Sequence, residues 1–331
     1  MRTAPLSAVA AELQLGPSRF CPRCRGSFAN DVATCPNDQT ALVVDRTGEV
    51  IADAYALRRL IGVGSLGSTI WEATQLALGR VVAVKLTPGH SDAQMRRFER
   101  GARIMAAMAH PHIAVVHDFG ALSHGEAFLV MERLRGAPLD RLLENGPLDV
   151  PRALTMASQL LRALAHTHRH GVVHRDVKPG NVFLAASDEG DFAVKLLDFG
   201  IARAADGTTD EPLEGPSRGR VTMKDRICGT PEYMAPEQAL GRPVDARVDV
   251  YGVGATLFRV LTGALPFEAD SRHQLAFMKT REDAPSIADA LPEARFAAPL
   301  VGIVARALAR DPAERYPSAQ AMLAEVDLLR R

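Results

Sequence analysis

The feature that most constrains this chain is the run HRDVKPGN at His174–Asn181, which places an acid, a cation and an amide at fixed spacing. Asp176 can orient a hydroxyl group and accept its proton, Lys178 can neutralise charge on a transferred phosphoryl group, and Asn181 can ligate a metal ion. Phosphoryl transfer needs these three kinds of group in one loop. A chance match of this length is rare, so the run predicts that chemistry.

A second segment, LLDFG, follows the first run and delivers Asp198 after apolar strand residues. A carboxylate at such a place can bridge Mg²⁺ to the β- and γ-phosphates of a nucleotide. The tripeptide Asp-Phe-Gly alone is more often a turn than a metal site. Its position after HRDVKPGN makes the prediction of a metal ligand specific.

A glycine-rich stretch upstream, IGVGSLGST, places Gly62, Gly64 and Gly67 between two predicted strands. Backbone N–H groups can approach phosphates there without a Cβ in the way. Lys85 then ends an alternating strand in the segment VAVK. A hairpin turn and an ordinary edge lysine are the alternatives, but the combination predicts a clamp for nucleotide phosphates.

The hydrophobic pattern changes along the chain and predicts an α+β fold. Alternation predicts strands at 55–61, 69–74 and 81–86, and apolar residues at helical spacing predict a helix over 93–109. Helical spacing also predicts helices over 151–170, 246–262 and 299–309. We therefore expect a β-rich first half and a mainly α second half, joined near Glu132–Gly136. The segment 202–226 has no apolar period and predicts a loop.

Composition excludes several other classes of protein. The 331 residues carry 39 Lys plus Arg and 39 Asp plus Glu, so no global field favours nucleic acid or anionic lipid. No apolar run approaches the roughly 18 residues of a spanning helix, and a secretory signal is not expected, so we predict a soluble, cytoplasmic chain. Residues 1–18 are expected to be a disordered leader.

These motifs together resemble a bacterial Hanks-type (eukaryotic-like) serine/threonine protein kinase over residues 55–329. Further family marks follow in order, namely CGTPEYMAPEQ at Cys228–Gln238, DVYGVG at Asp249–Gly254 and RDPAERYPS at Arg310–Ser318. The resemblance implies a bilobal kinase fold with ATP and Mg²⁺ or Mn²⁺ as cofactors. It also implies transfer of the γ-phosphoryl group to Ser or Thr hydroxyls of proteins, with autophosphorylation and signalling.

The resemblance assigns roles to individual residues. Met131 would guard the back of the adenine pocket, and residues 132–134 would offer hinge backbone groups to adenine. Glu237 would pair with Arg315, and Asp249 would brace the catalytic-loop backbone. The implied nucleotide and magnesium set is Ile61, Gly62, Gly64, Gly67, Lys85, Met131, Glu132, Leu134, Asn181 and Asp198, with Asn181 and Asp198 as the Mg²⁺ ligands. The implied catalytic set is Asp176, Lys178 and Lys85.

The sequence departs from this family at one important position. The helical glutamate that pairs with the strand lysine in the family falls on Gly101, in the segment RFERGARIMAAM. Glu99 lies about 200° around the helix from that position and so points elsewhere. The alternative to an active kinase is therefore an ATP-binding pseudokinase or weakly active regulatory module. A milder departure is Thr69, which leaves open whether Ile70 or Trp71 covers the adenine.

Loop phosphorylation is a further expectation. Arg175 directly precedes the catalytic aspartate, and a phosphate could pair with an arginine at that place. Thr222 is the preferred phosphorylation site, with Thr208, Thr209 and Ser217 as the other candidates. The alternative is that these are solvated loop hydroxyls.

The segment 19–44 predicts a small zinc-ribbon-like module ahead of the kinase domain, with 45–54 as a linker. Cys21 and Cys24 have knuckle spacing, Cys35 follows, and Asp38 stands where a fourth ligand of Zn²⁺ would lie. The alternative is a loop with free, reduced thiols. Such a module would serve regulation or docking of a regulatory protein, and the kinase domain could form a homodimer. Nearby arginines are interpreted as a solvated face, so no nucleic acid is expected.

Overall fold

The computed structural model describes residues 19–24, 26–29, 31–64, 67–89, 91–122, 125–187, 191–198 and 231–331. They divide into two compact units. The first comprises residues up to 90 together with 118–133, and the second comprises 91–117 together with 134–331. The predicted phosphorylation sites Thr208, Thr209, Ser217 and Thr222 lie outside the described residues.

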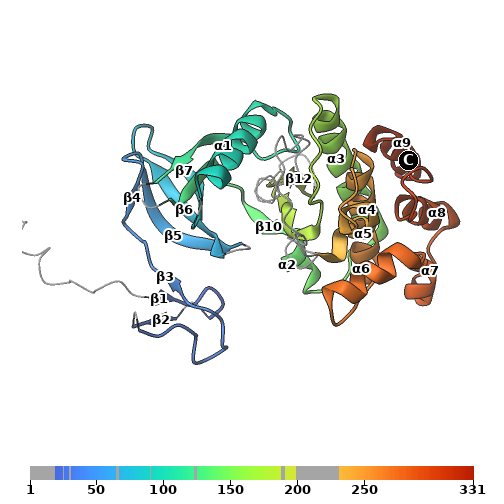
Figure 1. The fold of residues 1–331 in the computed structure, drawn as a ribbon, viewed down its shortest axis with the longest axis horizontal. Helices are drawn as coiled ribbons and strands as arrows, with labels where there is room; N and C mark the ends of the chain where they lie inside the picture. The colour runs from blue at the N-terminus through green and yellow to red at the C-terminus, as the bar shows by residue number, and fades with distance from the viewer. Residues whose placement is uncertain are drawn as a thin grey trace, which may run out of the picture. The chain divides into compact units, whose positions relative to one another are not determined.

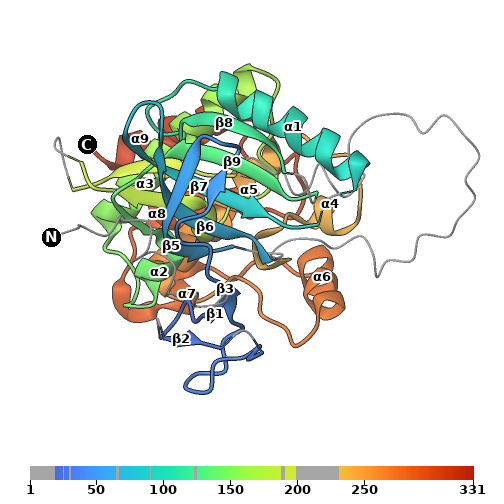
Figure 2. The same cartoon turned by 90° about the vertical axis from the view of Figure 1, so that its left-hand side faces the viewer.

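The first unit is built on a six-stranded sheet with the strand order β4-β5-β6-β7-β9-β8 (Figure 1). Neighbouring strands from β4 to β7, and β7 with β9, pair in antiparallel fashion. Figure 2 shows β5, β6, β7 and β9 side by side. The bounds are β4 Val50–Ile51, β5 Tyr55–Val63, β6 Thr69–Gln75, β7 Arg80–Thr87, β8 Val116–Ala121 and β9 Ala127–Glu132. The three strands predicted from alternation are thus confirmed as β5, β6 and β7.

Alternation along these strands divides the sheet into an apolar face and a second face. The apolar face contains Leu57, Trp71, Val84 and Val130, all nearly inaccessible to solvent, in one cluster. Successive side chains point to opposite faces, and cross-strand partners share a face. Ile70 pairs with Lys85 in the register of β6 and β7, so these two residues share the other face. Trp71 is therefore a core residue, and Ile70 lies on the face of Lys85.

A three-stranded sheet with the order β2-β1-β3 precedes the large one. Its strands are β1 Arg19–Phe20, β2 Ser27–Phe28 and β3 Val43–Val44. The stretch expected as a linker already contains β4, and Ile51 in that strand is 1% exposed within the core of the large sheet. Arg46 also donates hydrogen bonds to Glu126 at 2.8 and 2.7 Å. The large sheet thus extends into the expected linker, and the domain boundary drawn from the sequence stays a prediction.

The second unit is mainly helical, as the hydrophobic period predicted (Figure 1). Its longer helices are α1 Asp92–Ala107, α3 Val150–Arg169, α5 Arg247–Thr262, α6 Arg272–Arg281, α8 Ala298–Ala307 and α9 Ala319–Leu329. Its short elements are β10 Gly136–Pro138, α2 Leu139–Leu143, η3 Pro179–Asn181, β11 Val182–Ala185, β12 Ala193–Leu196, η6 Pro231–Tyr233, α4 Pro236–Ala239, α7 Ile287–Ala290 and η7 Pro292–Ala294. Strands β10, β11 and β12 form an antiparallel sheet.

Helices α3 and α5 form the core that supports the central loop of this unit. Asp149 caps α3 by accepting a hydrogen bond from the backbone of Arg152, and burial on α5 extends almost all round the helix. Two glycines of α5 permit close packing. A Cβ added at Gly252 would lie 2.8 Å from Cβ of Val177, and one at Gly254 would lie 2.8 Å from Cβ of Ala307. The loop that contains Val177 therefore rests directly on the α5 backbone.

Among the described residues, no helix is both long enough and apolar enough to cross a membrane.

Candidate active site

The loop between α3 and β11 brings three predicted residues together. The ammonium of Lys178 lies 2.8 Å from the Asp176 carboxylate, and both side chains are less than a fifth exposed. The amide of Asn181 donates hydrogen bonds to the carbonyl oxygen of Asp176 at 2.8 Å and to its Oδ2 at 2.9 Å. A cation and an amide are thus each held within hydrogen-bonding distance of the acid, as phosphoryl-transfer chemistry requires.

The backbone of this loop is fixed by a buried carboxylate, Asp249 on α5. Its two oxygens accept hydrogen bonds from the N–H groups of His174 at 2.8 Å and Arg175 at 2.7 Å. The expectation that Asp249 braces this loop is confirmed. Arg175 has a positive φ of 65°, which is costly for a residue with a Cβ. These charge-assisted hydrogen bonds offset that cost and set the direction of Asp176.

Asp198 is joined to the same loop through its neighbour. The N–H of Leu197 donates to the carbonyl oxygen of Asn181 at 2.9 Å, and the carbonyl of Leu197 lies 2.9 Å from Nε2 of His174. Asp198 itself is half-buried and has a φ of 45°, again in the left-handed region. The two expected magnesium ligands therefore sit on adjoining, hydrogen-bonded segments, with backbone strain at the second.

Residues 231–238 lie beside Asp176, and we refer to this segment as the wall. Asp176, Tyr233 and Met234 border the same tight gap, which is too narrow for a water molecule and is closed behind by α5. Gln238 on α4 donates from its side-chain amide to the carbonyl oxygen of Arg175 at 3.0 Å. Burial raises the pKa of Tyr233 to about 12, so its hydroxyl stays protonated at neutral pH. This segment therefore packs against the catalytic loop next to Asp176.

The predicted phosphate clamp occupies β5, β6 and β7 of the first unit. The N–H of Gly64 donates to the carbonyl of Ser68 at 2.8 Å, and a Cβ added at Gly64 would lie 2.4 Å from Oγ of Ser68. Gly67 has a φ of +75°. Both positions thus disfavour any residue with a side chain. Ile61 and Gly62 lie near the end of β5, and Lys85 is half-buried near the end of β7.

The other nucleotide residues of the first unit follow from the sheet register. Met131 pairs with Ala83, and Lys85 pairs with Leu129, so Met131 and Lys85 share a face of the sheet. Met131 and Glu132 end β9, and Leu134 follows in the second unit. The residues expected around adenine and phosphates thus comprise one set on the sheet, apart from Leu134, Asn181 and Asp198 in the second unit.

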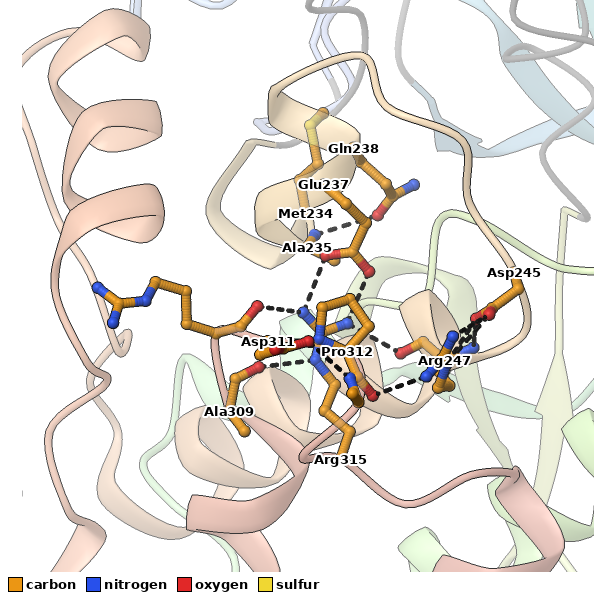
Figure 3. A network of polar contacts seen from close by, with 12 residues as sticks. Met234, Ala235, Glu237, Gln238, Asp245, Arg247, Ala309, Asp311, Pro312 and Arg315 are labelled. Atoms are coloured by element: carbon orange, nitrogen blue, oxygen red, sulfur yellow. Dashed lines mark hydrogen bonds and ion pairs between the residues drawn. The ribbon is translucent and has the colours of Figure 1, made fainter.

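A buried ion pair supports the wall from behind (Figure 3). Arg315 donates from both terminal nitrogens to Glu237, at 2.7 and 2.8 Å, and also to the backbone carbonyls of Ala309, Arg310 and Arg247. The predicted pairing of Glu237 with Arg315 is confirmed. Because Glu237 precedes Gln238 on α4, this ion pair holds the helix that contacts the backbone of Arg175.

The N-terminal module gathers the four residues expected to bind zinc. One potential ligand atom from each of Cys21, Cys24, Cys35 and Asp38 lies within 4.8 Å of every other. The Sγ atoms of Cys24 and Cys35 are 3.5 Å apart, and Asp38 lies 3.4 Å from Sγ of Cys21. Three thiol sulfurs and one carboxylate around a common point fit the tetrahedral preference of Zn²⁺.

Backbone N–H groups favour the charged forms of two of these groups. The N–H of Thr40 holds the pKa of Asp38 down at about 2, and the N–H of Gly26 lowers the pKa of Cys24. Burial instead raises the pKa of Cys35 to about 12. A bound cation would have to displace the proton of this last thiol.

Comparison with known proteins identifies the family. Residues 55–326 match the family model described as "Protein kinase domain". The chain belongs to the protein kinase family. The resemblance drawn from the sequence motifs and the α+β fold class are thereby confirmed.

Named relatives agree with this assignment, and a solved structure shares the fold. The serine/threonine-protein kinase pkn3 of Myxococcus xanthus is 39% identical over 84% of this chain and 50% of its own length. PknA of Mycobacterium tuberculosis is 38% identical over 82% of this chain and 60% of its own length. A solved structure titled "Crystal structure of Rad53 1-466 in complex with AMP-PNP" is 24% identical, with a TM-score of 0.65, and covers 82% of this chain and 64% of that one. This chain thus spans only part of the length of these relatives.

Helix α1 contains the departure from the kinase pattern. Gly101 lies in the middle of an uninterrupted helix that begins with a capping box at Ser91 and Gln94. Glu99 lies 3.4 Å from Arg103, one turn further along the same helix. The nearest acid in the sequence is therefore paired within its own helix, which agrees with the expectation that it points elsewhere.

Sequence reasoning missed three residues of this site. Gln238 holds the carbonyl of Arg175, His168 contacts Asp249 at 2.8 Å, and Asp140 on α2 lies beside the catalytic loop. A Cβ added at Gly180 would be 3.2 Å from Oδ2 of Asp140. No local spacing could reveal these contacts. The one available signal is general: a buried carboxylate needs hydrogen-bond donors, so Asp249 was bound to have partners.

Proposed function

We propose that this chain is an ATP-dependent serine/threonine protein kinase, which transfers the γ-phosphoryl group of ATP to Ser or Thr hydroxyls of proteins. The single observation that supports it best is the cluster of Asp176, Lys178 and Asn181 on a backbone fixed by Asp249. Two relatives named as serine/threonine-protein kinases add support.

In the proposed reaction Asp176 orients the acceptor hydroxyl and receives its proton. The hydroxyl oxygen forms a bond to the γ-phosphorus while the bond from that phosphorus to the oxygen of the departing ADP breaks. Lys178, held against Asp176, neutralises negative charge on the phosphoryl group in transit. Positioning and charge neutralisation, with little covalent work, account for this kind of catalysis.

Asn181 and Asp198 are the proposed ligands of Mg²⁺ or Mn²⁺. The Asn181 side chain uses its amide nitrogen toward Asp176, which leaves its carbonyl oxygen suited to a hard cation. The bound ion would supply charge neutralisation at the β- and γ-phosphates. Asp198 contributes a carboxylate from the adjoining segment.

The sheet of the first unit is the proposed ATP-binding surface. Gly62, Gly64 and Gly67 would let backbone N–H groups approach the phosphates, and Lys85 would contact them with its ammonium group. Ile61, Met131, Glu132 and Leu134 complete the proposed adenine site. Because Ile70 shares the face of Lys85, it is the better candidate than Trp71 for covering the base.

We also propose that the N-terminal module binds one structural Zn²⁺ through Cys21, Cys24, Cys35 and Asp38. Among its described residues the buried core is very small, with Leu42 joining the two buried cysteines and Phe28 and Val32 packed partly against them, so a cation would contribute much of its stability. Metal content of the purified chain, measured by native mass spectrometry, should show one zinc ion. Replacement of Asp38 by alanine should remove it, whereas replacement of the exposed Asp31 should not. Zinc retained by the Asp38 variant would contradict this ligand set.

A second candidate is an ATP-binding pseudokinase or weakly active regulatory module, favoured by Gly101. The family resemblance places a glutamate directed at Lys85 at that position, and this chain has glycine there. We further propose that the zinc module docks a regulatory protein and that the chain forms a homodimer. Phosphorylation at Thr222, Thr208, Thr209 or Ser217 would place a phosphate that Arg175 can bind.

One experiment separates the two candidates. Purified chain is incubated with labelled ATP and Mg²⁺, beside the Asp198→Ala and Gly101→Glu variants. An active kinase labels itself, Asp198→Ala does not, and Gly101→Glu labels faster. Wild type that labels no better than Asp198→Ala would favour the pseudokinase. A Gly101→Glu variant that is no faster would contradict the account of the missing ion pair.

A further inference from the structure

Lys279 on α6 is a buried lysine that no part of the proposed mechanism uses. It is 2% exposed, and its ammonium donates hydrogen bonds to the carbonyl oxygens of Glu232 at 2.7 Å and Met234 at 2.9 Å. The rings of Tyr251 and Phe267 flank it, with centroids 5.3 and 5.9 Å from Nζ. Over the described part of the chain, no carboxylate lies within ion-pair distance of this ammonium. Its partners are therefore two backbone carbonyls and two aromatic faces.

The two carbonyls belong to the wall beside the catalytic loop. Met234 and the intervening Tyr233 border the same tight gap as Asp176. Residues 231–234 thus border the catalytic loop at Asp176, so their position bears on where the polypeptide around an acceptor hydroxyl can lie. Burial of a lysine is unfavourable unless its ammonium is well compensated, and here the compensating hydrogen bonds all go to the backbone of one segment.

We propose that Lys279 is a positioning residue for the protein substrate: its ammonium holds residues 231–234 in the conformation against which the acceptor polypeptide docks. This inference rests on the proposed kinase function and deepens it. Lys279 does not touch ATP or the reacting atoms. Its loss should weaken docking of the acceptor and leave nucleotide binding unchanged.

The charge on Lys279 matters because charge-assisted hydrogen bonds are about twice as strong as neutral ones. Burial lowers the pKa of Lys279 to about 7, and the negative charge of Glu232 on η6 opposes this shift. Lys279 also packs against the ring of Tyr251 on α5, and the guanidinium of Arg315, paired with Glu237, lies 4.9 Å from the centroid of the same ring. As pH rises through neutrality the ammonium becomes an amine, which still donates but more weakly. Docking should therefore weaken from about pH 6 to about pH 8.

The test compares Lys279→Met, Lys279→Arg and wild type in the full chain. Arg281→Met is the matched control, since Arg281 is an exposed cation at the end of the same helix. The probe is a synthetic peptide with the sequence of residues 215–226, which includes Thr222. Steady-state kinetics give kcat and the KM values for peptide and ATP, and thermal unfolding shows that each variant is folded.

We expect Lys279→Met to raise the peptide KM about tenfold with the ATP KM within about twofold of wild type, because two charge-assisted hydrogen bonds are lost. Lys279→Arg should restore most of the affinity. Its peptide KM should also stay flat between about pH 6 and pH 8, where that of wild type rises. Arg281→Met should match wild type throughout.

Three outcomes would overturn the proposal. These are an unchanged peptide KM in folded Lys279→Met, equal changes in the KM values for peptide and ATP, and identical pH profiles for wild type and Lys279→Arg. The last comparison decides the matter if Lys279→Met does not fold. If wild type shows no turnover, the kinase proposal fails, and the peptide Kd measured by fluorescence anisotropy replaces KM in the same comparisons. If the peptide binds neither wild type nor any variant, the proposed role of Lys279 in docking the acceptor is overturned.

Discussion

At the scale of single residues, the site depends on a few side chains that satisfy backbone groups in costly conformations. Arg175 and Asp198 both have positive φ angles, and each lies next to a segment held by hydrogen bonds. Strain of this kind persists only where the surroundings fix the backbone, and it is concentrated at functional sites. Asp249 is the clearest example, because one buried carboxylate fixes two consecutive N–H groups.

Replacing Asp249 by asparagine tests this role. An asparagine side chain has one acceptor oxygen where Asp249 has two, so its amide would place a donor against a backbone N–H. We expect the free energy of unfolding to fall by about 3 kcal/mol and kcat to fall with it. Urea unfolding and steady-state kinetics check both. The control is Asp245→Asn, whose side chain is 56% exposed, and it should cost less than about 1 kcal/mol. Equal costs would contradict the special role of Asp249.

At the scale of elements, four histidines cluster where the segment after α1 meets the end of α3. The ring centroids of His110 and His166 are 5.0 Å apart, and those of His166 and His170 are 4.6 Å apart. Burial, with the charges of His112 and His166, lowers the pKa of His110 to about 4. His112 and His166 shift in the same direction, chiefly through burial. The packing between these elements therefore favours the neutral form of these imidazole rings.

This cluster predicts a loss of stability in acid. The unfolded chain binds the His110 proton near its ordinary pKa of 6.5, whereas the folded chain binds it only near 4. The stabilisation is therefore complete above about pH 6.5 and is lost as pH falls toward about 4. Between about pH 7 and pH 4.5 wild type should lose about 1 kcal/mol more than His110→Gln, after allowance for solvent screening. Urea titrations at both pH values check this. His273→Gln, at an exposed histidine of α6, should lose as much as wild type.

At the scale of the whole chain, segments far apart in the sequence are tied together by a few buried polar groups. Arg315 connects α4, the start of α5 and the turn after α8, and its side chain is inaccessible to solvent (Figure 3). Lys279 connects α6 to residues 232–234 in the same unit. The wall is thus held at two places, at the carbonyls of Glu232 and Met234 by Lys279 and at the carboxylate of Glu237 by Arg315.

Removing the ion pair between Arg315 and Glu237 should therefore lower the stability of the chain. Arg315→Met leaves the Glu237 carboxylate buried without its cation, so we expect a loss of about 3–5 kcal/mol in the free energy of unfolding. A double variant, Arg315→Met with Glu237→Met, should recover much of that loss because the stranded charge is gone. Thermal and urea unfolding of the three proteins check this. A double variant as unstable as the single one would show that the hydrogen bonds of Arg315 to backbone carbonyls dominate instead.

Much of the fold was predictable because its signals are local. Strands β5, β6 and β7 and helices α1, α3, α5 and α8 follow from apolar periods of two and 3.6, each set by neighbouring residues alone. Strand β4 was missed because two residues are too short to show a period, and Ile51 was thereby left in an expected linker. The choice between Ile70 and Trp71 also stayed open, since only the register of β6 against β7 decides which faces Lys85.

The sequence by itself determined which residues the proposed chemistry uses, because Asp176, Lys178 and Asn181 lie within one short loop, where their spacing already limits their separation. Cys21, Cys24, Cys35 and Asp38 were likewise predicted as a set from knuckle spacing. Only the tertiary structure decided the supporting contacts, such as Lys279 with the carbonyls of Glu232 and Met234, or Gln238 with Arg175. Such contacts join segments separated by tens of residues, and their geometry results from packing summed over the whole core. No local pattern carries that information, so the sequence predicts the proposed reaction but not the residues that we propose to position its substrate.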